Sequence, residues 1–272
     1  MNKKIIQLIC PDQKGIISKL TSVLYKTNHN ILSIQQHIDK EKEKFYIRIS
    51  VDVDSKNKFP EEKLFDLNKQ LNGKMCLFNS DKKINVAILG TKETEPVYDL
   101  LIKNESSNLR CNFPILISNH RKLSSVAKQF NINFRKIDDN IQLSEALTKN
   151  KVDLIVLARY MQIIPDNIVK EYQNNIINIH HGFLPAFKGA KPYHQAYNKG
   201  VKIVGATAHY VTSKLDEGPI ICQDTVQINH KHSINDIIQL GREIEKNVLY
   251  KAVKAHLDYK IIAYDNKTII FD

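Results

Sequence analysis

Residues 152–180 read VDLIVLARYMQIIPDNIVKEYQNNIINIH, and this stretch decides the fold class. Residues 152–157 are mostly apolar, which is typical of a strand buried on both faces of a sheet. Residues 165–172 predict a helix, and residues 176–180 predict the next strand. A strand, a helix and a second strand in this order indicate a βαβ unit with parallel strands.

The same alternation extends outward from this stretch. Two strands follow each other directly after residue 201, so we expect a mixed sheet. Ser233 and Asp236 have the spacing of a capping box and open a long helix that ends near His256. The other elements expected here are strands at 84–89, 113–118, 202–211 and 220–228, helices at 97–103 and 123–130, and a hairpin at 261–264 and 268–271.

The first 79 residues carry a different order of elements. Residues 16–24 place apolar side chains at helical spacing, and residues 31–38 and 45–53 predict a hairpin around a charged tip. Strands at 4–10 and 75–79 and a helix at 61–71 complete the set. The resulting order is that of a ferredoxin-like βαββαβ fold.

We therefore expect an α/β protein with two domains, because 272 residues exceed the roughly 100–200 residues of one domain. Residues 1–80 form the βαββαβ domain. Residues 84–272 form a Rossmann-like domain with a mostly parallel, mixed sheet. A polar stretch at 80–83 connects them.

Composition excludes some classes of protein. The formal net charge is +11, but the lysines are scattered, so no nucleic-acid partner is expected. Four cysteines without a CxxC pair suit a reducing compartment and predict a cytoplasmic protein. The N-terminal MNKKIIQLIC is too short in apolar residues for a signal peptide, and no stretch approaches the ~20 apolar residues of a membrane span.

Asn178 and His180 lie two residues apart at the end of a predicted strand, so their side chains face the same way. Open α/β sheets bind ligands beyond the carboxyl ends of their strands. An amide can donate to a developing oxyanion, and an imidazole can transfer a proton. Asp216, in the turn at 215–218, can orient the imidazole or a water molecule.

The residues alone leave two alternatives open. The polar side chains can simply cap the loop that follows the strand. They can also bind a metal, because His180, His181, His194 and Asp216 are all possible zinc ligands. No metal is predicted, since adjacent histidines on a strand diverge and no HExxH helix occurs.

Four motifs resemble those of a known family. They are NIHHGFLP at 178–185, GAKPYHQA at 189–196, GATAHYVT at 205–212 and LDEGP at 215–219. Together they resemble the folate-dependent formyltransferases, and most closely the formyltetrahydrofolate deformylase family. The resemblance runs from about residue 84 to 257, and the N-terminal region resembles an ACT domain, as in the deformylases.

This resemblance implies hydrolysis of 10-formyltetrahydrofolate to formate and tetrahydrofolate, which supplies formate for purine synthesis and balances the one-carbon pool. It implies that Asn178 and protonated His180 stabilise the tetrahedral oxyanion, that Asp216 positions water and relays protons, and that no metal or other cofactor takes part. The substrate-binding residues that it implies are Leu157, Met161, Gln162, Ile163, Ile164, His181, Val211 and Thr212. Core packing is the alternative for Met161, Ile163 and Ile164.

Transfer of the formyl group to an amine acceptor such as glycinamide ribonucleotide is the alternative within the same fold. The related transferases hold the acceptor's phosphate in a loop rich in Gly and Ser, whereas residues 89–96 here read LGTKETEP, with one glycine and two acids. His181 stands where the transferases usually have proline. Glu245, in contrast, matches an acid that contacts the acceptor amine in them. A catalytically inactive amino-acid sensor is a further alternative.

The ACT-like region implies regulation and assembly. Asp12 and Gly15 in the turn CPDQKG and Asn30 before the second strand match amino-acid-sensing loops, so a small amino-acid effector and a homo-oligomer are expected. An oligomerisation module without a ligand is the alternative. We also expect Arg159, Lys188 or Lys191 to attract the polyanionic glutamate tail of cellular folates.

Overall fold

The computed structural model describes residues 2–53, 57–186 and 191–272. They divide into two compact units, one of Met1–Lys82, Asp258–Ile262 and Ile269–Asp272, and one of Lys83–Leu257 and Ala263–Thr268. Two C-terminal segments that the sequence assigned to the second domain thus group with the first unit. The domain limits themselves stay a prediction.

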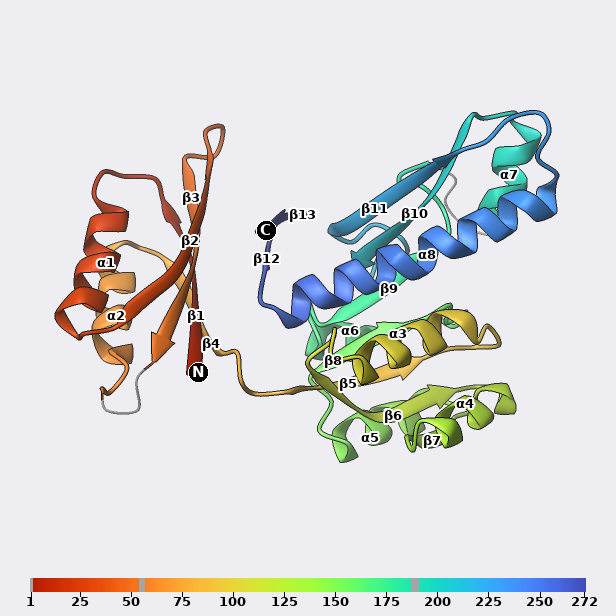
Figure 1. Ribbon diagram of the computed structural model, residues 1–272, viewed down its shortest axis with the longest axis horizontal. Coiled ribbons are helices and arrows are strands. Elements are labelled where there is room, and N and C mark those ends of the chain that lie inside the picture. The colour runs from red at the N-terminus through yellow and green to blue at the C-terminus, as the bar shows by residue number, and fades with distance from the viewer. Residues whose placement is uncertain (1, 54–56, 187–190) are drawn as a thin grey trace. The chain divides into compact units, whose positions relative to one another are not determined.

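The first unit has the predicted βαββαβ order (Figure 1). Its sheet is antiparallel with strand order β2-β3-β1-β4, and apolar residues of α1, α2, β1 and β3 form its core. Its elements are β1 (Asn2–Pro11), α1 (Ile16–Lys26), β2 (Asn30–Asp39), β3 (Lys44–Val53), α2 (Glu61–Gln70) and β4 (Lys74–Asn79).

Two buried polar side chains explain why the C-terminal segment belongs to this unit. Arg48 donates from Nε to the carbonyl oxygen of Tyr259 at 2.7 Å, and Gln7 donates from Nε2 to the same oxygen at 2.9 Å. The ring of Phe78 stacks on that of Tyr259. Buried polar groups need hydrogen-bond partners, and here the returning chain supplies them.

The second unit contains a seven-stranded sheet of order β11-β10-β9-β8-β5-β6-β7. The pairs from β9 to β7 are parallel, whereas β10 is antiparallel to both β9 and β11, so the predicted mixed sheet is confirmed. Its strands are β5 (Ile84–Leu89), β6 (Cys111–Ser118), β7 (Asn133–Lys136), β8 (Leu154–Leu157), β9 (Ile176–His180), β10 (Ile203–Tyr210) and β11 (Ile220–Gln227), and a separate pair is formed by β12 (Ile261–Tyr264) and β13 (Lys267–Ile270).

Helices cover this sheet (Figure 1). Apolar side chains of α5 and α6 pack with β5, β6, β8 and β9 in one core cluster. The long α8 packs against β9, β10 and β11. The helices are α3 (Glu95–Glu105), α4 (Ser124–Gln129, preceded by a 3-10 turn at Arg121–Leu123), α5 (Asn140–Lys149), α6 (Asp166–Glu171), α7 (Pro192–Asn198) and α8 (Ile234–Leu257).

Three of these elements, β7, α5 and α7, were not predicted. The helix α5 had a readable signal, since the Asp139 side chain accepts a hydrogen bond from the backbone of Gln142 and caps the helix. Leu143, Ala146 and Leu147 then form its buried stripe. The strand β7 has only four residues and lies at the sheet edge, so it lacks the apolar run of the central strands. In the described part of the chain no helix is long and apolar enough to span a bilayer.

His256, near the end of α8, makes stability depend on pH. Desolvation lowers the pKa of His256 from 6.5 to about 4, and its Nδ1 lies 2.8 Å from the Tyr210 hydroxyl. Between these two pH values the unfolded chain binds a proton that the folded chain does not. The free energy of unfolding therefore does not depend on His256 titration above pH 6.5, and it falls as the pH drops from 6.5 towards 4. We expect His256→Gln to remove a slope of up to about 1.4 kcal/mol per pH unit from the free energy of unfolding.

Urea unfolding of wild type and variant, near neutral pH and at about pH 5, measures this slope. His230→Gln is the control, because His230 is exposed. Equal slopes in the wild type and His256→Gln would contradict the prediction.

Candidate active site

Two side chains project from the end of β9 as the sequence predicted. The apolar residues Ile176, Ile177 and Ile179 are buried in the sheet and fix the strand, which leaves Asn178 and His180 on a shared face. His180 is 5% exposed. The neighbouring strand β10 is antiparallel and places His209 directly opposite Asn178.

Asp216 is brought to this strand end by a distant turn. Its backbone φ is 56°, and its Oδ2 lies 3.2 Å from Nδ1 of His180. Its Oδ1 lies 3.7 Å from Nε2 of His209. The hydrogen bond from His180 holds the pKa of the Asp216 carboxyl well below its usual range. The carboxylate is therefore ionised at neutral pH.

His209 completes the cluster, and it was not among the predicted site residues. Its Nδ1 lies 2.9 Å from the carbonyl oxygen of Tyr210, and its Nε2 lies 3.2 Å from Nδ2 of Asn178. A carbonyl can only accept, so Nδ1 carries the proton and Nε2 accepts from the amide. This contact fixes which end of the amide is nitrogen and leaves Asn178 a second N–H to donate.

The loop after His180 is held by a buried threonine. Thr207 donates from Oγ1 to the carbonyl oxygen of Gly182 at 2.9 Å and accepts from the backbone N–H of Leu184 at 3.1 Å. Gln223 donates to both Thr207 and the Leu184 carbonyl. A Cβ at position 182 would lie 2.9 Å from Nε2 of His180, so only glycine leaves room for the imidazole.

We expect Thr207→Val to lower the free energy of unfolding by about 2–3 kcal/mol, because the methyl group leaves buried donors and acceptors unsatisfied. Thr207 is fully buried. Thr225→Val on the neighbouring strand is the matched control, since Thr225 is exposed. Chemical denaturation measures both, and equal midpoints in the two variants would refute the role given to Thr207.

The turn that carries Asp216 is also fixed. A Cβ at Gly218 would lie 1.7 Å from the carbonyl oxygen of Tyr210, so the turn packs directly on the β10 backbone. Asn266 donates to the carbonyl oxygen of Glu217 at 2.9 Å, and Thr268 donates to that of Ile220 at 2.6 Å. These contacts hold the turn from both sides.

His181 and Glu245 lie next to this cluster. The ring of His181 is 5.5 Å from that of His180 and 6.0 Å from that of Tyr193. Desolvation and the nearby charge of Arg159 lower the pKa of His181 to about 3, so its imidazole is neutral. Burial raises the pKa of Glu245, and Arg159 and Tyr193 oppose that shift.

The eight residues expected to bind substrate fall into three groups. Leu157 and Ile164 are buried in a core cluster, and Val211 packs against it, as the core-packing alternative proposes for Ile164. Met161 and Ile163 are 55% and 80% exposed. The remaining three are the exposed Gln162 and the half-buried His181 and Thr212.

The residues expected to attract the glutamate tail differ in their surroundings. The side chain of Arg159 is 19% exposed and pairs with Glu245 at 3.5 Å. Lys191 has φ 52° at the start of α7 and is exposed. Lys188 lies outside the described residues.

In the first unit, the three residues expected to sense an effector are exposed. Gly15 has φ 87° and starts α1, a conformation that side chains rarely adopt. The backbone N–H of Asp12 donates to the carbonyl oxygen of Glu43, and Asn30 begins β2. Within residues 2–53, 57–186 and 191–272, no cluster of three or more His, Cys, Asp or Glu is arranged to hold a metal ion.

Known proteins share this architecture. The chain matches the family described as Formyl transferase over residues 84–253 and the family described as ACT domain over residues 4–63. The formyltetrahydrofolate deformylase of Synechocystis sp. is 40% identical over 273 residues, which cover 96% of each chain.

Solved structures agree with this. A formyltetrahydrofolate deformylase from Pseudomonas syringae pv. tomato has a TM-score of 0.96 at 36% identity and covers 100% of this chain and 95% of its own. A phosphoribosylglycinamide formyltransferase from Anaplasma phagocytophilum has a TM-score of 0.66 at 30% identity and covers 70% of this chain and 96% of its own. The transferase lacks a counterpart for almost a third of this chain, whereas the deformylases match it from end to end. The chain therefore belongs to the formyltetrahydrofolate deformylase family.

Proposed function

We propose that the protein hydrolyses 10-formyltetrahydrofolate to formate and tetrahydrofolate. The observation that carries this is the cluster at the end of β9, where an amide, an imidazole and an ionised carboxylate meet. The full-length likeness to deformylases supports water, rather than an amine, as the acceptor. The formate would serve purine synthesis and balance the one-carbon pool.

The proposed mechanism assigns one task to each group. Asp216 orients a water molecule, whose oxygen attacks the formyl carbon. Asn178 and protonated His180 donate hydrogen bonds to the oxyanion that forms, an effect that is typically worth about 3 kcal/mol for one donor. The C–N bond then breaks, its electron pair returns to the folate nitrogen, and a proton relayed through Asp216 and His180 completes the leaving amine. His209 holds the amide of Asn178 in its donating orientation.

The pterin would lie against the wall of Leu157, Ile164 and Val211, with the exposed Met161 and Ile163 at its edge. Gln162, His181 and Thr212 would add polar contacts. The reaction as written balances with water and folate alone, so we propose that no metal or cofactor takes part. All four cysteines are free thiols, which suits the cytoplasmic location that we propose.

We further propose that residues 1–80 form a regulatory domain in a homo-oligomer, and that a small amino acid binds near Asp12, Gly15 and Asn30. Calorimetric titration of the full chain with single amino acids tests this. Heat in the wild type that disappears in Asp12→Ala supports a site, whereas no heat with any amino acid favours a module without a ligand.

Incubation with 10-formyltetrahydrofolate and no added amine tests the main proposal. We expect formate and tetrahydrofolate to accumulate in equal amounts and in many turnovers. Formyl transfer that starts only when glycinamide ribonucleotide is added would overturn the proposal in favour of the transferase alternative.

A further inference from the structure

The sheet reverses its strand order between β5 and β8. The chain adds β6 and β7 on one side of β5 and then β8 and β9 on the other side. In open α/β sheets, ligands bind in the crevice outside the carboxyl ends of the strands at this switch point. Here Glu93 and Glu95 follow β5, Arg159 follows β8, and Arg242 and Glu245 come from α8.

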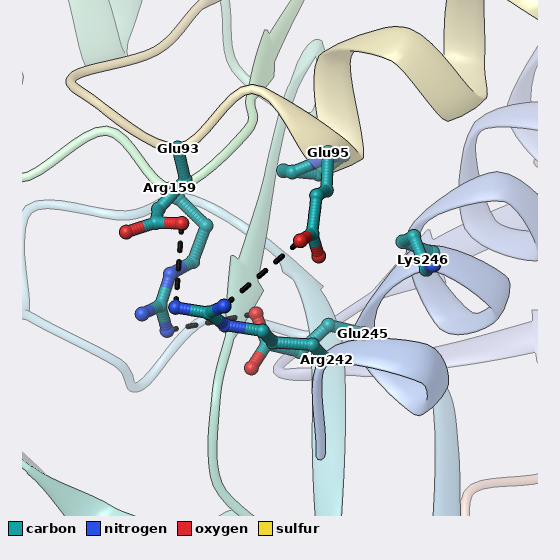
Figure 2. A pocket seen from close by; sticks show the side chains of 7 residues that line it. Glu93, Glu95, Arg159, Arg242, Glu245 and Lys246 are labelled. Atoms are coloured by element: carbon teal, nitrogen blue, oxygen red, sulfur yellow. Dashed lines mark ion pairs between the residues drawn. The ribbon is translucent and has the colours of Figure 1, made fainter. Parts of the chain in front are cut away.

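This crevice is filled by the chain's own charges (Figure 2). Arg242 pairs with Glu93 at 3.5 Å and with Glu95 at 3.9 Å, and Arg159 pairs with Glu245 at 3.5 Å. Together these five residues form what we call the crevice cluster. The cavity that remains among them is about 10 Å³, which is room for about one water molecule.

Within the crevice cluster, the pair Arg159–Glu245 is fixed by a further contact to Tyr193. The Tyr193 hydroxyl donates to Oε1 of Glu245 at 2.8 Å, and Glu245 is 3% exposed. A Cβ at position 241 would lie 2.2 Å from the Tyr193 ring, so α8 reaches Tyr193 only because residue 241 is glycine. Separating Arg159 from Glu245 would leave a buried charge without its partner, which is strongly unfavourable.

The crevice cluster adjoins the proposed reaction centre. In the parallel pairing of β8 and β9, Leu157 is the register partner of Asn178, and Arg159 lies two residues after Leu157. The charge of Arg159 acts on His181, whose ring lies between those of His180 and Tyr193. A second substrate that entered from the switch point would therefore have to pass through the crevice cluster.

We propose that the crevice cluster closes the switch-point crevice to amine acceptors and so leaves water as the nucleophile for the formyl carbon. This rests on the proposed hydrolase function. With water, a C–O bond forms and the C–N bond to the folate breaks, which gives formate and tetrahydrofolate. With a primary amine in place of water, a new C–N bond forms and the products are a formamide and tetrahydrofolate. Arg159 is thus a specificity-determining residue, because it pairs with Glu245, the acid whose counterpart contacts the acceptor amine in the related transferases.

The test measures how the formyl group divides between water and a small amine. Each protein is incubated with 10-formyltetrahydrofolate and excess glycinamide, and both formate and N-formylglycinamide are quantified. The opened variant is Arg159→Ala, which breaks the ion pair, keeps the Glu245 carboxyl as an acceptor for the Tyr193 hydroxyl and leaves that carboxyl free to meet the amine. Arg242→Ala is a second, milder variant, because its side chain is 41% exposed and its loss leaves no fully buried charge. Arg135→Ala is the control, since Arg135 pairs with Glu145 at the same 3.5 Å away from the crevice.

We expect the fraction of formyl groups that reaches glycinamide to rise about tenfold or more in the opened variant, the range in which pocket shape discriminates between small substrates. Arg242→Ala should show a smaller rise in the same direction, and Arg135→Ala should behave as the wild type does. Continued formate release with no rise in either crevice variant would overturn the proposal, and so would equal transfer by the wild type. Absence of formate from the wild type would instead refute the hydrolase function itself.

Discussion

Asp216→Asn is expected to lower kcat for formate release by about 10³–10⁴-fold, as the same change does where an aspartate orients a catalytic imidazole. The amide has nearly the shape of the carboxylate but carries no charge. It is a weaker acceptor for the His180 imidazole than the carboxylate is, and it cannot relay a proton. Steady-state formate release measures the effect. KM should change little, because Asp216 acts on the water and the imidazole rather than on the pterin.

Glu217→Gln is the matched control for this variant, because it neutralises the next, exposed residue of the same turn. We expect Glu217→Gln to retain the wild-type rate. A rate for Asp216→Asn within a few-fold of the wild type would show that the carboxylate has no part in the reaction, whatever its distance from His180.

His180→Ala is expected to lower kcat by about 10²–10⁴-fold, the usual contribution of a positioned acid–base group. The variant loses a donor to the oxyanion and the proton path to the leaving amine. Since His180 and Asp216 act as a pair, the double variant should be little slower than the slower single variant. Single-turnover formate release measures all three proteins.

His180→Gln separates the two tasks of the imidazole. Glutamine can still donate a hydrogen bond but cannot exchange a proton at neutral pH. A partial rescue by glutamine would assign most of the effect to oxyanion stabilisation. His230→Ala, at an exposed position, is the control and should not change the rate. Near wild-type activity in His180→Ala would remove His180 from the mechanism.

The strands that carry the proposed site could be predicted because strands that are buried on both faces are mainly apolar. The expected bounds of β5 and β9 agree with the structure, at Ile84–Leu89 and Ile176–His180. Shorter elements at the periphery carry weaker patterns, because only one of their faces is buried. This is why β7 and α7 were missed, and why α5 was missed despite its capping residue.

The roles of Thr207 and His209 in the proposed site could not be predicted from the sequence. Both lie in the segment GATAHYVT, two residues apart on one face of β10, so alternation could have marked them as a pair. Nothing in the sequence, however, says which strand β10 pairs with or in which register. The antiparallel pairing with β9 places His209 opposite Asn178, and that pairing is a tertiary fact.

Arg159, in contrast, was selected from the sequence, but for a role other than the one that the structure suggests. Its charge and its place after β8 suggested a surface role toward an anionic tail. The structure turns the side chain inward, because Glu245 of α8 lies behind it and is buried. The charge of Arg159 thus pairs with a residue of α8, which is distant in the sequence, and no local sequence pattern predicts this pair.

By itself, the sequence determined the order of the longer elements, the α/β class, and the residue types at the strand end where Asn178 and His180 lie. It could do so because hydrophobic periodicity and turn chemistry act over a few neighbouring residues. Only the tertiary structure decided that Asp216 and His209 meet these two, and that Arg159 and Glu245 fill the crevice beside them. These contacts depend on strand pairing and helix packing between segments that are distant in the sequence. The partner of each charged side chain is therefore set by the tertiary fold and not by its neighbours in the sequence.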